Sequence, residues 1–132
     1  MNNRIKKELM LLQSFYVKVI YNNNGQWVFI EDYPILPGLP WNRQKTNVCF
    51  QIPTAYPGTP PYGFYVPSGI LCDDKSPNNY QEPATNKPPF LGEWGFFSWT
   101  QESGWYATGD PRSGSNLLSF ARTFRDRFIE GR

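Results

Sequence analysis

The chain has 132 residues, which suits one domain and leaves no room for two ordinary ones. Hydrophobic residues make up 39% and charged residues 18%, so the chain can bury a core and does not resemble a disordered segment. The net charge of +2 excludes a bulk polycation for nucleic acid, and the absence of histidine excludes a Ser-His-Asp triad, a Cys-His dyad and a His-ligated zinc site.

Cysteine usage and hydropathy bear on the compartment. Cys49 and Cys72 are too few for a disulfide scaffold or a zinc knuckle. The N-terminus has no long apolar stretch of the kind that a signal peptide needs, and no apolar run approaches the roughly 20 residues that span a bilayer. We therefore expect a cytoplasmic protein with no cofactor, no membrane partner and no nucleic-acid partner.

The first half of the chain predicts one helix followed by strands. A helix is expected over residues 4–15, because Ile5, Leu9 and Leu12 form an apolar stripe at helical spacing. In residues 46–52 the side chains alternate, so Val48, Phe50 and Ile52 should share one face. The β-rich segments, separated by turn formers and prolines, are 15–21, 27–31, 46–52 and 62–66.

The second half is less regular. Residues 68–89 have few large apolar side chains and many turn formers, which predicts a long irregular surface insertion with at most a short strand at 70–72. Residues 90–105 are rich in aromatic side chains and should be buried or form a binding surface. A last helix is expected over 114–129, with Asp110-Pro111, Ser113 or Ser115 as alternative starts. Its charged residues, predicted as a solvated face, are Arg122, Arg125, Asp126 and Arg127.

Strands in one run, flanked by helices, indicate an α+β domain over residues 1–132. Two segments resemble ubiquitin-conjugating enzymes. Residues 4–9, Arg-Ile-Lys-Lys-Glu-Leu, are similar to the opening helix of that family, and residues 50–61 contain its Tyr-Pro-x-x-Pro-Pro bend after the third strand. Trp105 resembles the tryptophan that precedes the family's second helix. The resemblance implies a ubiquitin-conjugating fold with a four-stranded antiparallel meander.

The family's reaction is acyl transfer, so the resemblance implies two partners, a ubiquitin-like modifier and its activating enzyme. The family's His-Pro-Asn signature is absent, because the chain has no histidine, and Ser76-Pro77-Asn78 is a faint counterpart. Eight residues after Asn78, where the family has its cysteine, stands Asn86. In these departures the chain resembles divergent bacterial branches of the family. Those branches are often associated with antiphage defence, and some of them lack the standard active site.

The resemblance also implies a nucleophile when one counts backward from Trp105. The family's cysteine lies about eight residues before that tryptophan, and Ser98 lies seven before it. Ser98 would form an oxyester and would need a base, with Glu93, Glu102 and Asp110 as candidates. The alternative interpretation is a structural serine inside an aromatic segment.

Cys72 is the second candidate nucleophile. It stands at the end of an apolar run and before Asp73 and Asp74, whose charges would raise its thiol pKa. An inert loop cysteine is the alternative, and Cys49 is expected to be buried in a strand. Asn78 or Asn79 could stabilise an oxyanion or simply form a turn.

Two binding roles remain open. Arg4, Lys6 and Lys7 lie off the apolar stripe of the first helix and should face solvent; by resemblance this surface docks the activating enzyme. The alternatives to an acyl carrier are a catalytically inactive adaptor that binds modifier or activating enzyme, and an aromatic-lined ligand-binding module, for example for carbohydrate. Aromatic residues that could form either core or ligand platform are Trp94, Phe96, Phe97, Trp99 and Trp105.

Overall fold

The computed structural model describes residues 2–101 and 104–132 and has an α+β fold, as predicted. Within those residues no helix has the length and apolar character needed to cross a bilayer. The elements in chain order are α1 (Asn3–Phe15), β1 (Lys18–Asn22), β2 (Trp27–Pro34), β3 (Lys45–Gln51), β4 (Phe64–Pro67), β5 (Tyr80–Gln81), β6 (Trp94–Phe97), α2 (Leu117–Arg122) and α3 (Phe124–Glu130).

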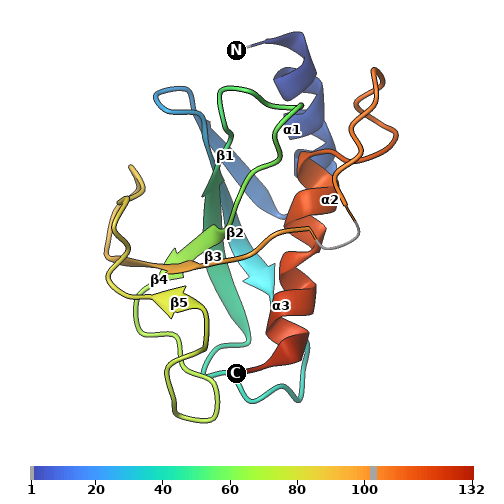
Figure 1. Cartoon of the computed structure of the whole chain (residues 1–132). Helices are drawn as coiled ribbons and strands as arrows, with labels where there is room; N and C mark the ends of the chain where they lie inside the picture. The colour runs from blue at the N-terminus through green and yellow to red at the C-terminus, as the bar shows by residue number, and fades with distance from the viewer. Residues whose placement is uncertain (1, 102–103) are drawn as a thin grey trace.

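In the described residues the sheet has six antiparallel strands in the order β1-β2-β3-β4-β6-β5, where the sequence predicted four. Figure 1 labels β1 to β5 of this sheet. The two additional strands are β5 and β6. β5 lies in residues 68–89, which were predicted as an irregular insertion, and β6 lies in the aromatic-rich residues 90–105. β6 pairs with β4 along its length, with Val66 opposite Gly95, and β5 adds the edge. β5 is only two residues long, so its side chains carry no periodicity that sequence reasoning could detect.

The predicted first helix is present and is capped by Asn2, whose side chain accepts a hydrogen bond from the Ile5 N–H at 2.8 Å. The predicted C-terminal helix is present, but it differs in its start and in its continuity. It begins later, at Leu117, with Asn116 as its N-cap, and it is interrupted at Thr123. The Thr123 hydroxyl donates to the Phe120 carbonyl at 2.6 Å. It therefore competes with backbone N–H groups for a carbonyl that a continuous helix would use.

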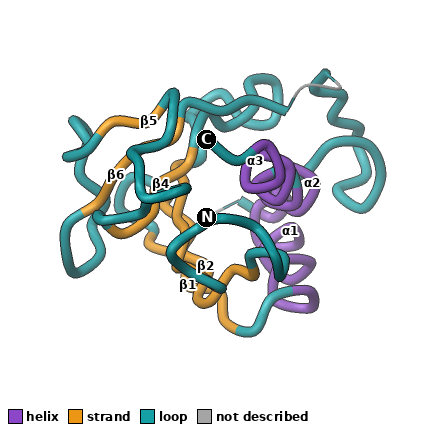
Figure 2. Tube along the Cα trace, turned by 90° about the horizontal axis from the view of Figure 1, so that it is seen from below, coloured by secondary structure: helices purple, strands orange, loops and turns teal. Residues whose placement is uncertain are grey.

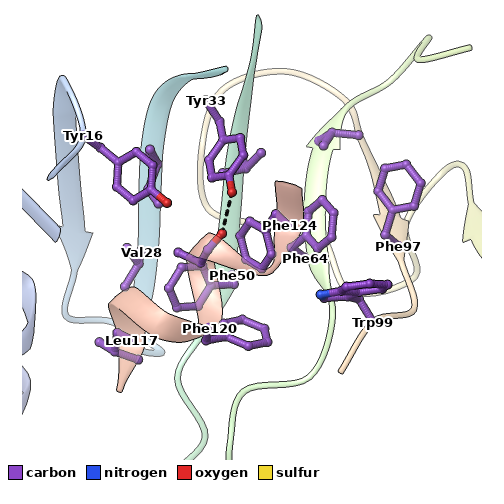
Figure 3. Packing of buried hydrophobic residues seen from close by; sticks show 14 of the residues in the cluster. Tyr16, Val28, Tyr33, Phe50, Phe64, Phe97, Trp99, Leu117, Phe120 and Phe124 are labelled. Atoms are coloured by element: carbon purple, nitrogen blue, oxygen red, sulfur yellow. Dashed lines mark hydrogen bonds between the residues drawn. The ribbon is translucent and has the colours of Figure 1, made fainter. Parts of the chain in front are cut away.

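The helices cover one face of the sheet, and the main core lies between the helices and that face (Figure 2). Alternate strand residues point into it, including Val48 and Phe50 as predicted. Figure 3 shows Phe64 and Phe124 stacked across the layers, with ring centroids 4.1 Å apart. In the same view the Tyr33 hydroxyl donates to the Ala121 carbonyl at 2.7 Å, which fixes α2 over β2.

The opposite face of the sheet carries a second, smaller aromatic cluster. Its buried members are Trp27, Cys49, Tyr65 and Trp94. Ala84 and Phe90, from the loop between β5 and β6, pack against it. Residues 68–89 are therefore not only a surface excursion: besides β5, they contribute Ile70 and Cys72 to the main core.

A fully buried carboxylate joins three distant parts of this fold. Glu8 on α1 pairs with the Arg4 Nε at 2.7 Å, accepts a hydrogen bond from the Tyr56 hydroxyl in the proline-rich bend, and accepts the Leu117 N–H at 2.6 Å. Arg4 also donates to the Thr108 carbonyl. Glu8 lies off the apolar stripe of Ile5, Leu9 and Leu12, yet it is buried because the bend and α2 close over that side of the helix.

Replacing this carboxylate should destabilise the protein strongly. In Glu8→Ala the Tyr56 hydroxyl, the Leu117 N–H and the Arg4 cation lose their buried partner. We expect the free energy of unfolding to fall by about 3 kcal/mol, measured by urea denaturation followed by tryptophan fluorescence. Lys7→Ala, one residue away and exposed, should change it by less than about 0.5 kcal/mol. Equal stability of the two variants would contradict this role of Glu8.

Candidate functional site

Ser98 lies directly after β6, and its side chain is exposed. Its N–H donates to the Asn79 carbonyl at 2.9 Å, and the carbonyl of the next residue, Trp99, accepts the Gly63 N–H at 2.7 Å. Because the Trp99 ring is buried in the main core, the backbone on both sides of the serine is held in place. The hydroxyl is thus presented to solvent from an anchored segment.

A hollow of about 240 Å³ opens beside this serine. Its lining residues are Tyr62, Asn79, Ser98, Trp99, Thr100, Arg127 and Glu130. The structure therefore brings Ser98 together with one of the two asparagines considered for oxyanion stabilisation, Asn79. Asn78 is not among the lining residues, and its carbonyl accepts a hydrogen bond from Arg127 at 2.8 Å. A hydroxyl, an amide, a guanidinium and a carboxylate share this one hollow.

Arg127 supplies a buried positive charge to the hollow. Only 2% of the residue is exposed, so the predicted solvated face is wrong for Arg127, whereas Arg122, Arg125 and Asp126 are exposed as predicted. Its guanidinium lies 4.8 Å from the centre of the Phe97 ring and donates to the carbonyls of Gly131, at 2.5 Å, and Asn78. Burial lowers its pKa, and the Glu130 carboxylate opposes that effect. Both hydrogen-bond partners of its guanidinium in the described residues are neutral carbonyls, so no direct ion pair there cancels its charge.

Glu130 is the carboxylate that sequence reasoning missed. Of the three predicted bases, Glu93 is exposed and lies 3.8 Å from Lys87, and Asp110 accepts the Arg112 N–H in a turn at 3.0 Å. Neither lines the hollow, and Glu102 lies outside the described residues. Glu130 reaches the site only because the C-terminal end of α3 lies beside the end of β6, which no local pattern reveals.

Cys72, the second candidate, is fully buried under the C-terminus. A Cβ added at Gly131 would lie 3.8 Å from its sulfur. Burial and the Asp73 carboxylate raise the pKa of the Cys72 thiol, and the charges of Arg127 and Arg132 act in the opposite direction. Cys49 is buried as predicted, and its burial raises the pKa of that thiol far more. Both cysteines are therefore poor nucleophiles in this conformation.

The predicted docking residues separate into two groups. Lys6 and Lys7 are exposed on α1, as expected. Arg4 is not a free surface charge: its side chain is only 17% exposed and is engaged by Glu8 and the Thr108 carbonyl. Any docking surface on this helix therefore consists of the two lysines, and Arg4 holds the helix to the loop before α2.

Comparison with protein families, with curated proteins and with solved structures found no match to the chain. The described residues also contain no group of three side chains suited to hold a metal ion. The chemistry of the site therefore has to be argued from its own geometry.

The burial of both thiols predicts slow modification of the native protein. With an aromatic disulfide reagent at about pH 7, we expect neither Cys49 nor Cys72 to react on the timescale of a free thiol, and both to react in denaturant. Because the pKa values of both thiols are raised, the native protein should still hold little thiolate at about pH 8.5, where about half of free cysteine is ionised, so its reaction should remain much slower than that of free cysteine. Rapid native labelling of Cys72 would contradict the buried position and restore it as a nucleophile.

Proposed function

We propose that this chain is a divergent ubiquitin-conjugating-like protein that carries a ubiquitin-like modifier on Ser98. The observation behind the proposal is the hollow that the exposed Ser98 lines together with Asn79, Arg127 and Glu130. Acyl transfer needs these functions together: a nucleophile, a proton acceptor and donors for the oxyanion. The partners are a ubiquitin-like modifier and its activating enzyme, and no cofactor takes part.

The proposed reaction has two steps. The Ser98 oxygen attacks the carbonyl carbon of the modifier's terminal thioester, forming a C–O bond and breaking the C–S bond. Glu130 takes the hydroxyl proton, which passes to the departing thiolate, while Asn79 and Arg127 stabilise the tetrahedral oxyanion. A target amine then attacks the ester, forming the amide and returning the proton to the serine. The exposed carboxylate substitutes for the histidine that the chain lacks.

The arrangement of the fold gives further support. The resemblance rests on the opening helix and the proline-rich bend, and the structure joins the two through the buried Glu8. Trp105, matched to the family's tryptophan, packs on Tyr56 of the same bend with ring centroids 5.7 Å apart. Its indole N–H donates to the Pro57 carbonyl at 2.6 Å. The residues used for the resemblance are therefore neighbours in space, as members of one structural unit should be.

The alternative is an inactive adaptor that binds the modifier or the activating enzyme without a covalent step. The burial of Cys49 and Cys72 favours it, since neither thiol is available for a thioester. It differs from the acyl carrier in one measurable property, the absence of an adduct.

Formation of a covalent adduct tests the proposal. With modifier, activating enzyme and ATP, we expect the chain to form an adduct that withstands thiols but is cleaved by mild base, as an oxyester is. Ser98→Ala should abolish it, and Ser98→Cys should replace it with a thiol-sensitive adduct. Glu130→Gln should slow its formation by about 10²-fold, the usual effect of losing a general base.

Two variants serve as controls. Ser76→Ala removes another exposed serine outside the hollow and should leave the adduct unchanged. An adduct that survives Ser98→Ala but is lost in Cys72→Ala would refute the serine. Binding of modifier or activating enzyme with no adduct in any variant would identify the adaptor.

The exposed lysines of α1 give a separate prediction on docking. Reversing both charges, Lys6→Glu with Lys7→Glu, should weaken binding to the activating enzyme by about tenfold at low salt and less at high salt. Unfolding should be unaffected, because both side chains are exposed. Lys75→Glu with Lys87→Glu makes the same charge change elsewhere and is the control. Equal affinity of the two double variants would remove α1 from the interface.

A further inference from the structure

A second, larger hollow lies at the end of the sheet formed by the β1–β2 turn and the proline-rich bend. Figure 1 shows these two segments at the same end of the molecule. The groove has a volume of about 800 Å³, within the range of small-molecule sites. Its described lining residues are Asn23, Gly25, Gln26, Gln51, Ile52, Pro53, Thr54, Thr59, Pro60, Tyr62, Tyr65 and Phe96.

The chemistry of this groove is uniform. None of its described lining residues carries a charge, in a chain with 13 basic and 11 acidic residues. Its polar groups are amides and hydroxyls, and its apolar lining consists of aromatic rings together with Ile52, Pro53 and Pro60. Tyr62 is 59% exposed, and its ring centroid lies 6.2 Å from that of Phe96, which in turn lies 4.7 Å from that of Tyr65.

The groove is held in shape before any ligand binds. The Gln51 side chain donates to the Gly25 carbonyl at 2.9 Å and accepts from Asn86 at 3.3 Å, so its amide is already occupied. Gly63, with φ of 73°, allows the Phe96 ring to lie against the backbone, since an added Cβ would be 2.1 Å from that ring. The aromatic surface therefore needs no rearrangement to receive a ligand.

Gln26 provides an independent indication of a ligand. Its φ is 58°, in the left-handed region where glycine fits without strain and glutamine does not. The backbone there is structural, because the Gln26 carbonyl accepts the Ile52 N–H at 2.8 Å. Its side chain, however, makes no hydrogen bond within residues 2–101 and 104–132, although it lines the groove. Strained residues occur at functional sites, and this one adds to the groove an amide that has no partner in the described residues.

We infer that this groove binds a neutral oligosaccharide. Exposed aromatic faces carry partial negative charge and attract the C–H faces of sugar rings, while neutral amides and hydroxyls match sugar hydroxyls without the desolvation of a charge. An extended peptide fits less well, because β3, β4 and β6 are internal strands of the sheet and offer it no free edge for pairing. This activity is separate from the proposed acyl transfer, since among the described residues only Tyr62 borders both hollows.

The test uses maltotriose, cellotriose and chitotriose, with binding measured by saturation-transfer NMR and titration. At least one should bind in the millimolar range or tighter. Tyr62→Ala and Gln26→Gly should each weaken that binding by about tenfold or more. Gln26→Gly relieves the backbone strain, so its urea midpoint should be no lower than that of the unmodified chain.

Tyr106→Ala is the matched control, because Tyr106 is 79% exposed and does not line the groove. It should bind sugar as the unmodified chain does. No binding of any of the three sugars, or binding that Tyr62→Ala and Gln26→Gly leave unchanged, would overturn the inference. So would tighter binding of an uncharged Gly/Ser-rich peptide than of any sugar. Gln26→Gly should still form the Ser98 adduct if that function exists, so failure of one proposal is distinguishable from failure of the other.

Discussion

The buried carboxylate of Glu8 is the constraint on which much of this structure depends. A charge without exposed surface is tolerated only when several donors surround it, and here they come from α1, the proline-rich bend and the first turn of α2. These segments are separated by 48 and 109 positions from Glu8. Glu8 therefore fixes the start of α2 to α1. This anchoring also sets the direction in which α2 and α3 cross the sheet.

That direction determines where the end of α3 lies. The helices pack over the main core, and Arg127 is buried between the rings of Trp41 and Phe97 with its guanidinium bound to neutral carbonyls. Its charge and the Glu130 carboxylate are thereby placed beside Ser98. A site without histidine can still combine a nucleophile, a carboxylate and a cation, because the helix end provides the last two.

The two faces of the sheet carry different chemistry. The helical face is closed by aliphatic and aromatic packing and leaves the charged hollow at its margin. The opposite face has an aromatic cluster covered only in part by the loop before β6, and next to it a neutral groove. Tyr62 stands between the charged hollow and the neutral groove. One domain thus presents two hollows of different chemistry, a charged one for which we propose acyl transfer and a neutral one for which we propose sugar binding.

Local patterns were sufficient for part of the fold. The stripe of Ile5, Leu9 and Leu12 determined α1, and alternation of Val48 with Cys49 determined which side of β3 enters the main core, because periods of 3.6 and 2 are properties of the backbone itself. The two-residue strand β5 and the break at Thr123 could not be predicted, since one depends on pairing with β6 and the other on a side-chain hydrogen bond within the helix.

The candidate site divides in the same way. Counting backward from Trp105 selected Ser98 as a candidate nucleophile. The resemblance identified the proline-rich bend. The tertiary structure alone decided that Cys72 is covered, that Glu8 and Arg127 are buried, and that Glu130 stands beside the serine. Each of these depends on segments far apart in the chain packing against one another, and the free energy of burying a charge or a thiol is set by those neighbours and not by the adjacent residues.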